Sequence, residues 1–326
     1  MVGARLTTPS VASPLVLERD ISVAAAKPVI DLACPLLREL VDHGTSALIQ
    51  CNQMSPRSAD GRFACHALYR HIIEMTDGIE VLISQCCAKP AVPALRSSFE
   101  GLLYLTYILE DNSKYAQRSD SWFVNSIRQW LSYYDLTNRG HNRGRAFHEA
   151  LKRRTTQPIS LPHFTPEDVA SRPGNFRKLL AEPQYQAIET EFKRQKKSNP
   201  NWYTLFGGPQ NLQELARKLQ LLPEYEVLYR QWSKTAHAQE HMNFFGPSRG
   251  EQSFMARLRE QKDLPLVSLL AVAIMEKATR RMLRGFRPDE DIEPWCREQV
   301  KPRLDQLQKL TGQVIKERDI KEPLKP

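Results

Sequence analysis

Apolar residues recur at steps of three and four along most of this chain, and this periodicity restricts the fold more than any other feature. In the segment 62–88 an apolar stripe follows helical spacing through Phe63, Leu68, Ile72, Met75, Ile79 and Ile83. Such a stripe is typical of an amphipathic helix whose apolar face packs against a core. Convincing alternation of apolar and polar residues, the pattern of a half-buried strand, is missing from the sequence. The sequence therefore predicts an all-α protein built as a helical bundle.

The same spacing predicts further helices over residues 30–52, 94–111, 121–136, 211–222 and 253–283, and a last polar helix over 288–316. The segment 94–111 follows two prolines and is apolar on nearly all sides, so we expect it to be the most buried helix. Prolines, glycines and charged residues accumulate between about 139 and 210, which indicates an irregular basic insertion carrying short helices.

The expected organisation has three parts. Residues 1–59 form an N-terminal segment and helix, residues 60–285 form the main bundle with its insertion at about 139–210, and residues 286–326 form a C-terminal polar helix and tail.

Cysteine usage and hydropathy indicate a reduced, cytoplasmic protein with no membrane partner. The six cysteines show no CxxC spacing and no regular disulfide framework. The N-terminus lacks the pattern of a secretory signal, and apolar runs stay well short of the roughly 20 residues that a membrane span requires. Walker, dinucleotide-binding and nucleophile-elbow motifs are missing from the sequence, so we expect no cofactor.

Positive charge is concentrated in one segment. The formal net charge is +9, and residues 139–197 contain thirteen Lys or Arg against six Asp or Glu. Basic residues beside aromatic ones suit a phosphate backbone with unstacked bases. The candidate nucleic-acid-binding residues are Arg139, Arg143, Arg145, Lys193, Arg194, Lys196, Lys197 and Trp202. The alternative is a solvated insertion without a nucleic-acid partner.

The segment 225–245, YEVLYRQWSKTAHAQEHMNFF, contains the candidate catalytic residues. Arg230 and His237 are seven residues apart, so a helix would present both on one face with Ser233 between them. RNA cleavage without a metal needs a base, an acid and a cation beside the phosphate, which histidine and arginine can supply. One copy of each is half of that set, so the catalytic hypothesis implies a homodimer. Alternatively, His237 hydrogen-bonds a neighbour and Arg230 forms an ion pair.

A polar stripe on the expected central helix supplies possible supporting groups. Arg96, Glu100, Tyr104 and Tyr107 follow steps of four, four and three. Buried charges need partners, so we expect the stripe to face the Arg230 helix. Glu100 would orient His237 or pair with Arg230, and Arg96 would add positive charge. The competing interpretation is an internal Arg96–Glu100 pair that only fixes the packing register.

Metal chemistry is the least favoured interpretation of this segment. His237, Glu240 and His241 match the H-x-x-E-H pattern of a zinc hydrolase. A third ligand is not evident, and an all-α chain lacks the mixed sheet on which such enzymes are built, so no metal ligand is assigned. His141 and His148 are interpreted as residues of a basic surface loop rather than ligands.

The run NWYTLFGGPQNLQELARKLQLLPEYEVLYRQWSKTAHAQ, together with LRSSFEGLLYLTYILED, resembles an uncharacterised bacterial family, a domain of unknown function. Its members carry an Arg-x-x-x-Glu helix and, after an insertion, a Tyr-x-x-x-Tyr-Arg-x-x-Ser-x-x-x-His helix. The arginine–histidine spacing is also loosely similar to that of the HEPN helical domains, many of which are dimeric, metal-independent ribonucleases. In this chain Gln231 stands where those nucleases often carry Asn, Asp or His.

This second resemblance implies an endoribonuclease, as in a toxin or phage-defence effector, that acts on RNA as a homodimer. The alternative is a helical module that binds nucleic acid or an acidic protein without cutting it.

Overall fold

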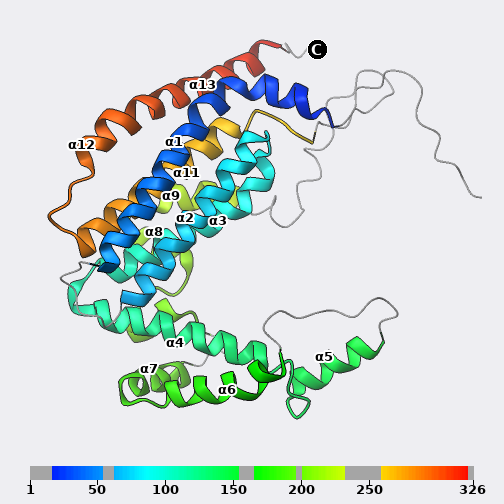
Figure 1. Ribbon diagram of the computed structural model, residues 1–326, viewed down its shortest axis with the longest axis vertical. Helices are drawn as coiled ribbons and strands as arrows, with labels where there is room; N and C mark the ends of the chain where they lie inside the picture. Colours follow the sequence, from blue (N-terminus) through cyan, green and yellow to red (C-terminus); the bar gives the residue numbers. More distant parts are fainter. Residues whose placement is uncertain (1–16, 54–61, 154–164, 196–199, 232–257, 322–326) are drawn as a thin grey trace, which may run out of the picture. The chain divides into compact units, whose positions relative to one another are not determined.

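The computed structural model describes residues 17–53, 62–153, 165–195, 200–231 and 258–321, and every regular element within these ranges is helical (Figure 1). The predicted all-α fold class is therefore confirmed. None of the helices in these ranges is both long enough and apolar enough to cross a membrane. The chain divides into two compact units. Unit 1 comprises Met1–Met54, Tyr69–Leu102 and Pro223–Pro326, and unit 2 comprises Ser55–Leu68 and Leu103–Leu222.

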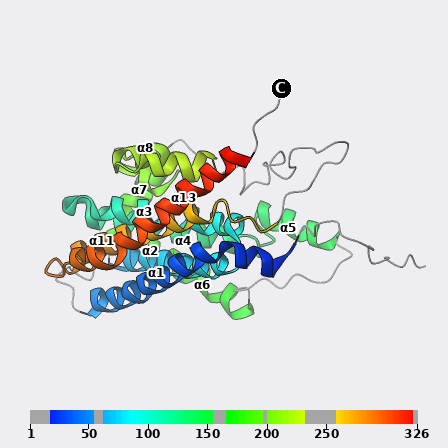
Figure 2. The ribbon, with the colours of Figure 1, turned by 90° about the horizontal axis from the view of Figure 1, so that it is seen from above.

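Unit 1 is centred on α1 (Arg19–Gln53) and α11 (Leu264–Phe286), which pack along one another. The C-terminal helix α13 (Lys301–Lys321) follows the short α12 (Glu293–Trp295) and η5 (Cys296–Val300), and it contacts both α1 and α11 (Figure 2). The expected boundaries at 59 and 286 do not coincide with the two units, because the terminal helices belong to the core of unit 1.

Helices α2 (Arg62–Ser84) and α3 (Ala88–Leu109) contribute most of their length to unit 1. The buried Tyr69 hydroxyl of α2 hydrogen-bonds to the Thr279 hydroxyl of α11 at 2.8 Å. The Cys34 thiol of α1 donates to the Glu80 carbonyl of α2 at 3.8 Å. Helix α3 is buried on most sides, as its apolar composition predicts.

Helix α1 begins at Arg19, eleven residues before the predicted start at residue 30. Pro28 and Pro35 lie inside it, and proline removes a backbone donor and disfavours a helix interior. Ser22, Ala26 and Val29 nevertheless continue the buried face at steps of four and three. Burial of this face outweighs the local preference of the prolines.

Phe63 was predicted to face the core, and this prediction is wrong because its side chain is 63% exposed. The stripe members Leu68, Ile72, Ile79 and Ile83 are buried. Phe63 lies in the first part of α2, which belongs to unit 2, and its ring contacts Trp122 and Phe123 there at centroid distances of 6.4 and 5.6 Å.

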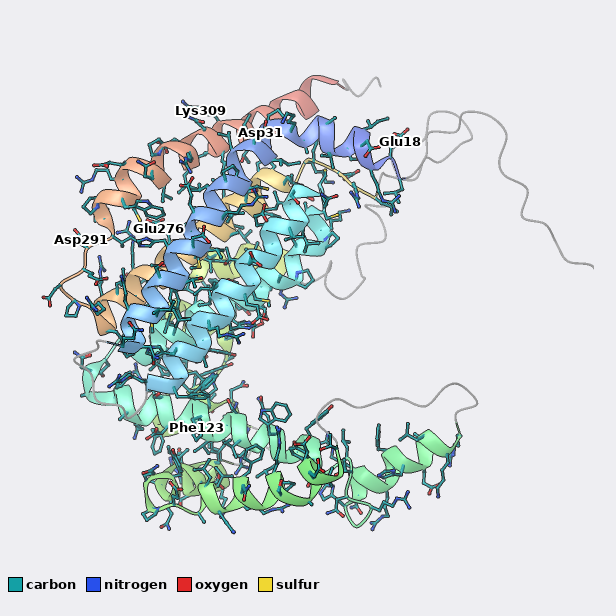
Figure 3. The ribbon with its side chains drawn as sticks, viewed as in Figure 1. Glu18, Asp31, Phe123, Glu276, Asp291 and Lys309 are labelled. Atoms are coloured by element: carbon teal, nitrogen blue, oxygen red, sulfur yellow. The ribbon has the colours of Figure 1, made fainter. Side chains whose placement is uncertain are left out.

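Unit 2 is built around α4 (Tyr115–Tyr134), which follows the short η1 (Asn112–Lys114). Helices α6 (Pro166–Leu180) and α7 (Pro183–Arg194) pack against it, as does η2 (Trp202–Gly207) (Figure 1). Phe123 on α4 is labelled in Figure 3. Its ring centroid lies 5.7 Å from that of Tyr185 on α7. Arg128 pairs with Glu189 of α7 at 3.0 Å.

The predicted irregular insertion is more regular than expected, since it contains α5 (Asn142–Lys152), α6 and α7. Its prolines start helices: Pro166 and Pro183 occupy first-turn positions, where a missing backbone N–H costs nothing. Thr165 caps α6 by accepting from the Asp168 backbone N–H at 3.1 Å. Helix α8 (Leu212–Lys218) then completes unit 2.

Candidate functional site

The segment that carries Arg230 comprises α9 (Leu222–Tyr225), which lies in unit 1 except for its first residue, and η3 (Glu226–Gln231), a short π-helix. π-helical turns are rare and occur frequently at functional sites. The Lys277 ammonium of α11 pairs with Glu224 at 2.5 Å, and Leu228 is fully buried. The Lys277–Glu224 ion pair and the burial of Leu228 therefore both fix the backbone that leads into Arg230.

Two charged residues of α3 meet this segment at Tyr229. The Tyr229 hydroxyl donates a hydrogen bond to the Glu100 carboxylate. The Arg96 guanidinium carbon lies 4.3 Å from the centroid of the Tyr229 ring, within the range of a cation–π interaction. The Tyr225 ring stacks on Tyr229 with centroids 5.1 Å apart and planes 9° from parallel. We call Arg96, Glu100 and Tyr229 the phenol cluster.

The environment of the phenol cluster keeps Tyr229 protonated. Burial raises the pKa of Tyr229 well above its usual value, and the hydrogen bond to Glu100 and the charge of Glu100 add to this, while Arg96 opposes it. At neutral pH the phenol is therefore a fixed donor. The Arg96 Nε atom is buried and has no hydrogen-bond partner among the residues that the structure describes.

The polar stripe on α3 thus faces η3 through its first two members, Arg96 and Glu100. The sequence analysis expected Glu100 to orient His237 or to pair with Arg230. Within the described residues Glu100 instead accepts a hydrogen bond from the Tyr229 phenol. The last two members contact η2 instead: the rings of Tyr104 and Tyr107 lie 5.5 and 5.8 Å from that of Trp202.

Arg230 itself lies on η3, but its side chain is outside the described part of the chain. Ser233 and His237 are outside the described residues entirely, as are Glu240 and His241. Their assignments therefore rest on the sequence alone. In the described ranges, no group of three or more His, Cys, Asp or Glu side chains is placed to hold a metal ion.

The basic candidates that the structure describes lie on unit 2 and are exposed: Arg139, Arg143, Arg145, Lys193 and Arg194. Lys196 and Lys197 lie outside the described residues. The Arg194 guanidinium is occupied by Glu191, with Nε and an Nη atom 2.8 and 3.0 Å from its two carboxylate oxygens. Arg145 donates to the Gly140 carbonyl at 3.2 Å, and Arg143 donates to the Ser132 hydroxyl.

Two neighbouring hollows in unit 2 are each lined by one of the basic residues that the sequence analysis assigned to nucleic-acid binding. Arg143 lines a hollow of about 580 Å³, and Lys193 lines another of about 480 Å³. Both are lined by Leu180 and Glu189, so they adjoin. The basic lining residues of the pair are Arg128, Arg143, Arg177 and Lys193, against the acidic Asp135 and Glu189. The adjoining hollows therefore carry an excess of positive charge.

Trp202 differs in position from the other nucleic-acid-binding candidates, because it is only 4% exposed. Its ring packs against Tyr104 and Tyr107 and lines a separate cavity. The exposed aromatic ring in this stretch is Phe206, at 40%. The sequence analysis assigned Trp202 and not Phe206, because only the fold separates the packed ring from the accessible one.

The two histidines of the 139–148 segment have structural roles. The His141 Nδ1 atom accepts from the Arg143 backbone N–H at 3.3 Å and so caps α5. The His148 Nε2 atom lies 3.4 Å from the Thr137 carbonyl oxygen. His148 therefore lies on α5 and His141 directly before it, whereas the sequence analysis expected a surface loop.

Comparison with known families adds one finding. The model of a family of unknown function, DUF5677, matches residues 62–252, which is more than half of the 326 residues and includes the phenol cluster. Comparisons with the curated proteins and with solved structures return no match.

Proposed function

Because the chain belongs to the DUF5677 family of unknown function, its activity has to be inferred from its own side chains, and we propose that it is a metal-independent endoribonuclease. One observation carries the proposal. Arg96 and Glu100 both contact Tyr229, the residue directly before Arg230. The charged stripe of α3 and the turn that carries the candidate phosphate-binding arginine are therefore packed together, as a site assembled from these two helices requires.

In the proposed reaction His237 accepts the proton of a ribose 2′-hydroxyl. The 2′-oxygen then bonds to the adjacent phosphorus, and the bond from phosphorus to the 5′-oxygen breaks. A second histidine, supplied by the partner copy of a homodimer, protonates the departing 5′-oxygen. The products are a 2′,3′-cyclic phosphate and a 5′-hydroxyl, so protons and bonds balance without a metal ion.

The arginines and polar groups of the site have supporting roles in this proposal. Arg230 binds the phosphate oxygens, and Arg96 adds a second positive charge beside them. Glu100 acts as a positioning residue, because it holds Tyr229 and with it the start of the catalytic segment. Ser233 supplies a hydroxyl on the face shared by Arg230 and His237.

The direct test is an RNA-degradation assay with and without chelator on the full chain. We expect cleavage that is insensitive to chelator, lost in His237→Ala and Arg230→Ala, and retained in the matched control His241→Ala. Products should carry the 2′,3′-cyclic phosphate. Loss of cleavage with chelator, His237→Ala and His241→Ala alike would favour the zinc hydrolase instead.

Thermal unfolding of the same variants separates chemistry from stability. A catalytic His237 on an exposed face should leave the melting temperature nearly unchanged, because surface substitutions shift stability by only about 0.5 kcal/mol. A folded His237→Ala protein with unaltered RNA cleavage would eliminate the proposal.

A second candidate function is non-catalytic binding of nucleic acid, and the adjoining hollows of unit 2 favour it. Their excess of arginine and lysine on one surface suits a phosphate backbone. Removing one phosphate contact lowers the salt dependence of the binding constant by about one unit of slope. We expect this reduction in Arg143→Gln and Lys193→Gln.

Two controls make this binding test specific. Arg194→Gln should have a smaller effect, because Glu191 already occupies that guanidinium. Lys27→Gln removes an exposed lysine of unit 1 and should leave the slope unchanged. An equal change in all four variants would mean that only the net charge matters.

A further inference from the structure

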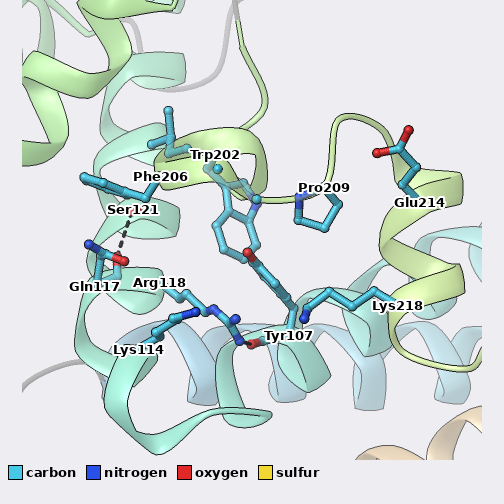
Figure 4. Close-up of a pocket in the computed structure, with 13 residues that line it drawn as sticks. Tyr107, Lys114, Gln117, Arg118, Ser121, Trp202, Phe206, Pro209, Glu214 and Lys218 are labelled. Carbon is cyan, nitrogen blue, oxygen red and sulfur yellow. Dashed lines mark hydrogen bonds between the residues drawn. The ribbon is translucent and has the colours of Figure 1, made fainter.

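A cavity of about 350 Å³ lies within unit 2, where α4, η2 and α8 meet the end of α3 (Figure 4). This volume falls within the range of about 300–1,000 Å³ that is typical of small-molecule sites. The rings of Trp202 and Tyr107 form part of its wall and are 4% and 5% exposed. The cavity therefore has a fixed aromatic wall.

Three of the four charged residues that line the cavity are cations: Lys114, Arg118 and Lys218. Figure 4 shows all three side chains on the same side of the cavity as Tyr107. The Glu110 carboxylate is shared by two of them, lying 3.3 Å from Arg118 and 3.1 Å from Lys218. The third cation, Lys114, pairs with Asp111 at 3.7 Å, so two carboxylates face three cations and the group keeps a net positive charge.

The fourth charged lining residue, Glu214, is acidic, and its carboxylate forms hydrogen bonds away from the three cations. Its carboxylate accepts from the Gln210 backbone N–H at 2.9 Å and from the Asn211 side-chain amide at 3.4 Å, at the start of α8. In Figure 4 it points away from the three cations. The cationic side of the cavity therefore suits an anionic group.

The rim of the cavity contains a strained residue. Phe206 has φ 54° and ψ 36°, a left-handed conformation that is unfavourable for a bulky side chain. Its backbone N–H donates to the Glu191 carboxylate at 3.2 Å, and Glu191 is itself buried against Arg194. This contact helps to hold the turn, and the Phe206 ring stays 40% exposed beside the cavity. Strained backbone conformations of this kind cluster at ligand-binding and active sites.

We propose that this cavity binds a nucleotide. The base would stack on Phe206, the exposed ring at the rim, because aromatic rings are sequence-tolerant partners for bases. The phosphate would lie against Lys114, Arg118 and Lys218, where ammonium and guanidinium groups form charge-assisted hydrogen bonds. The nucleotide is either free or the terminal residue of an RNA strand, since both present the same ring and phosphate. None of the lining residues has a role in the endoribonuclease proposal, so this proposal does not depend on it.

Calorimetric titration of the full chain tests this assignment with four probes. These are AMP, adenosine without the phosphate, ribose 5-phosphate without the base, and a short RNA carrying a 5′-phosphate. AMP should bind at least about tenfold more tightly than either fragment, since each lacks one of the two contacts. The RNA identifies the source: tighter binding than AMP indicates a strand terminus, and equal or weaker binding indicates a free nucleotide. Failure of both AMP and the RNA to bind would overturn the proposal.

Two variants locate the binding in this cavity. Lys218→Gln should weaken AMP binding about tenfold, whereas the matched control Arg217→Gln, an exposed cation on the same turn of α8, should not. Phe206→Gly removes the ring and relieves the strain, so we expect weaker binding together with an unchanged or higher melting temperature. Equal effects of the two charge substitutions, or full affinity in Phe206→Gly, would contradict the site.

Discussion

The Tyr229 hydroxyl donates a hydrogen bond to the Glu100 carboxylate across 129 positions of the chain, and this bond joins the central helix α3 to η3. Tyr229→Phe removes the donor and leaves the half-buried carboxylate without it. We expect a loss of about 1–3 kcal/mol in the free energy of unfolding, measured with urea. Tyr225→Phe is the matched control, because it deletes a hydroxyl from the stacked neighbouring ring and should cost no more than about 0.5 kcal/mol.

Alkaline pH should weaken the same interaction. The pKa of Tyr229 is raised above its usual value of 10.0, first by burial and then by Glu100. The unfolded chain therefore loses this proton before the folded protein does, so the contribution of Tyr229 to stability is complete below pH 10 and declines above it. The stability difference between the wild type and Tyr229→Phe should shrink by about 1.4 kcal/mol for each pH unit above 10. Parallel curves between pH 9 and 11 would show that this pKa shift is absent.

Replacing glycine with alanine should have opposite effects on stability at two positions, Gly208 and Gly174. A Cβ atom at Gly208 would lie 2.0 Å from the Tyr203 carbonyl oxygen and 2.8 Å from the Tyr107 hydroxyl, so the turn would have to move. We expect Gly208→Ala to lower stability by more than about 2 kcal/mol. At Gly174, inside α6, a Cβ atom would meet nothing within 4 Å. Gly174→Ala should raise stability by about 0.5–1 kcal/mol, because alanine favours the helix.

Thiol labelling of the native protein should detect one cysteine that reacts much faster than the others. All six cysteines are free, and all but Cys87 are buried. Burial raises the pKa of Cys34 to about 12 and the pKa of Cys51 and Cys296 each to about 11. Because the thiolate is the reactive form, these thiols are protected by protonation as well as by burial. A chromogenic disulfide reagent at pH 8 should modify Cys87 first and the others only in denaturant, and Cys87→Ser should abolish the fast phase.

Helical periodicity was sufficient to predict the fold class, because apolar side chains at steps of three and four can be buried together only on a helix. It was insufficient where tertiary contacts override local preference. Pro28 concealed the first part of α1. Phe63 fits a helical stripe in the sequence, but it lies in the first part of α2, which belongs to unit 2, whereas the stripe from Ile72 onward belongs to unit 1.

The candidate site was predicted in part. Steps of four placed Arg96 and Glu100 on one face of α3, and the need to pair charges predicted that this face would meet the Arg230 segment. The partner could not be chosen from the sequence, because several polar groups of that segment were possible partners for Glu100. Phe206 could not be identified at all, since a left-handed phenylalanine is stabilised by Glu191, fifteen positions away.

The packing of α1 against α11 has a consequence for how the protein is made. Helix α1 buries residues along its whole length, from Ser22 to Cys51, and much of that face meets a helix that begins at Leu264. The Tyr69–Thr279 hydrogen bond spans 210 positions, so at about 5–20 residues per second the ribosome needs on the order of 10–40 s to supply the second partner. During that time the first helix leaves the exit tunnel with its apolar face uncovered, which makes the nascent chain a natural client for chaperones. Unit 2, which is complete by Leu222, can fold earlier. A stop codon before α11 would therefore release a chain in which unit 2 is complete but the face of α1 that packs on α11 stays uncovered.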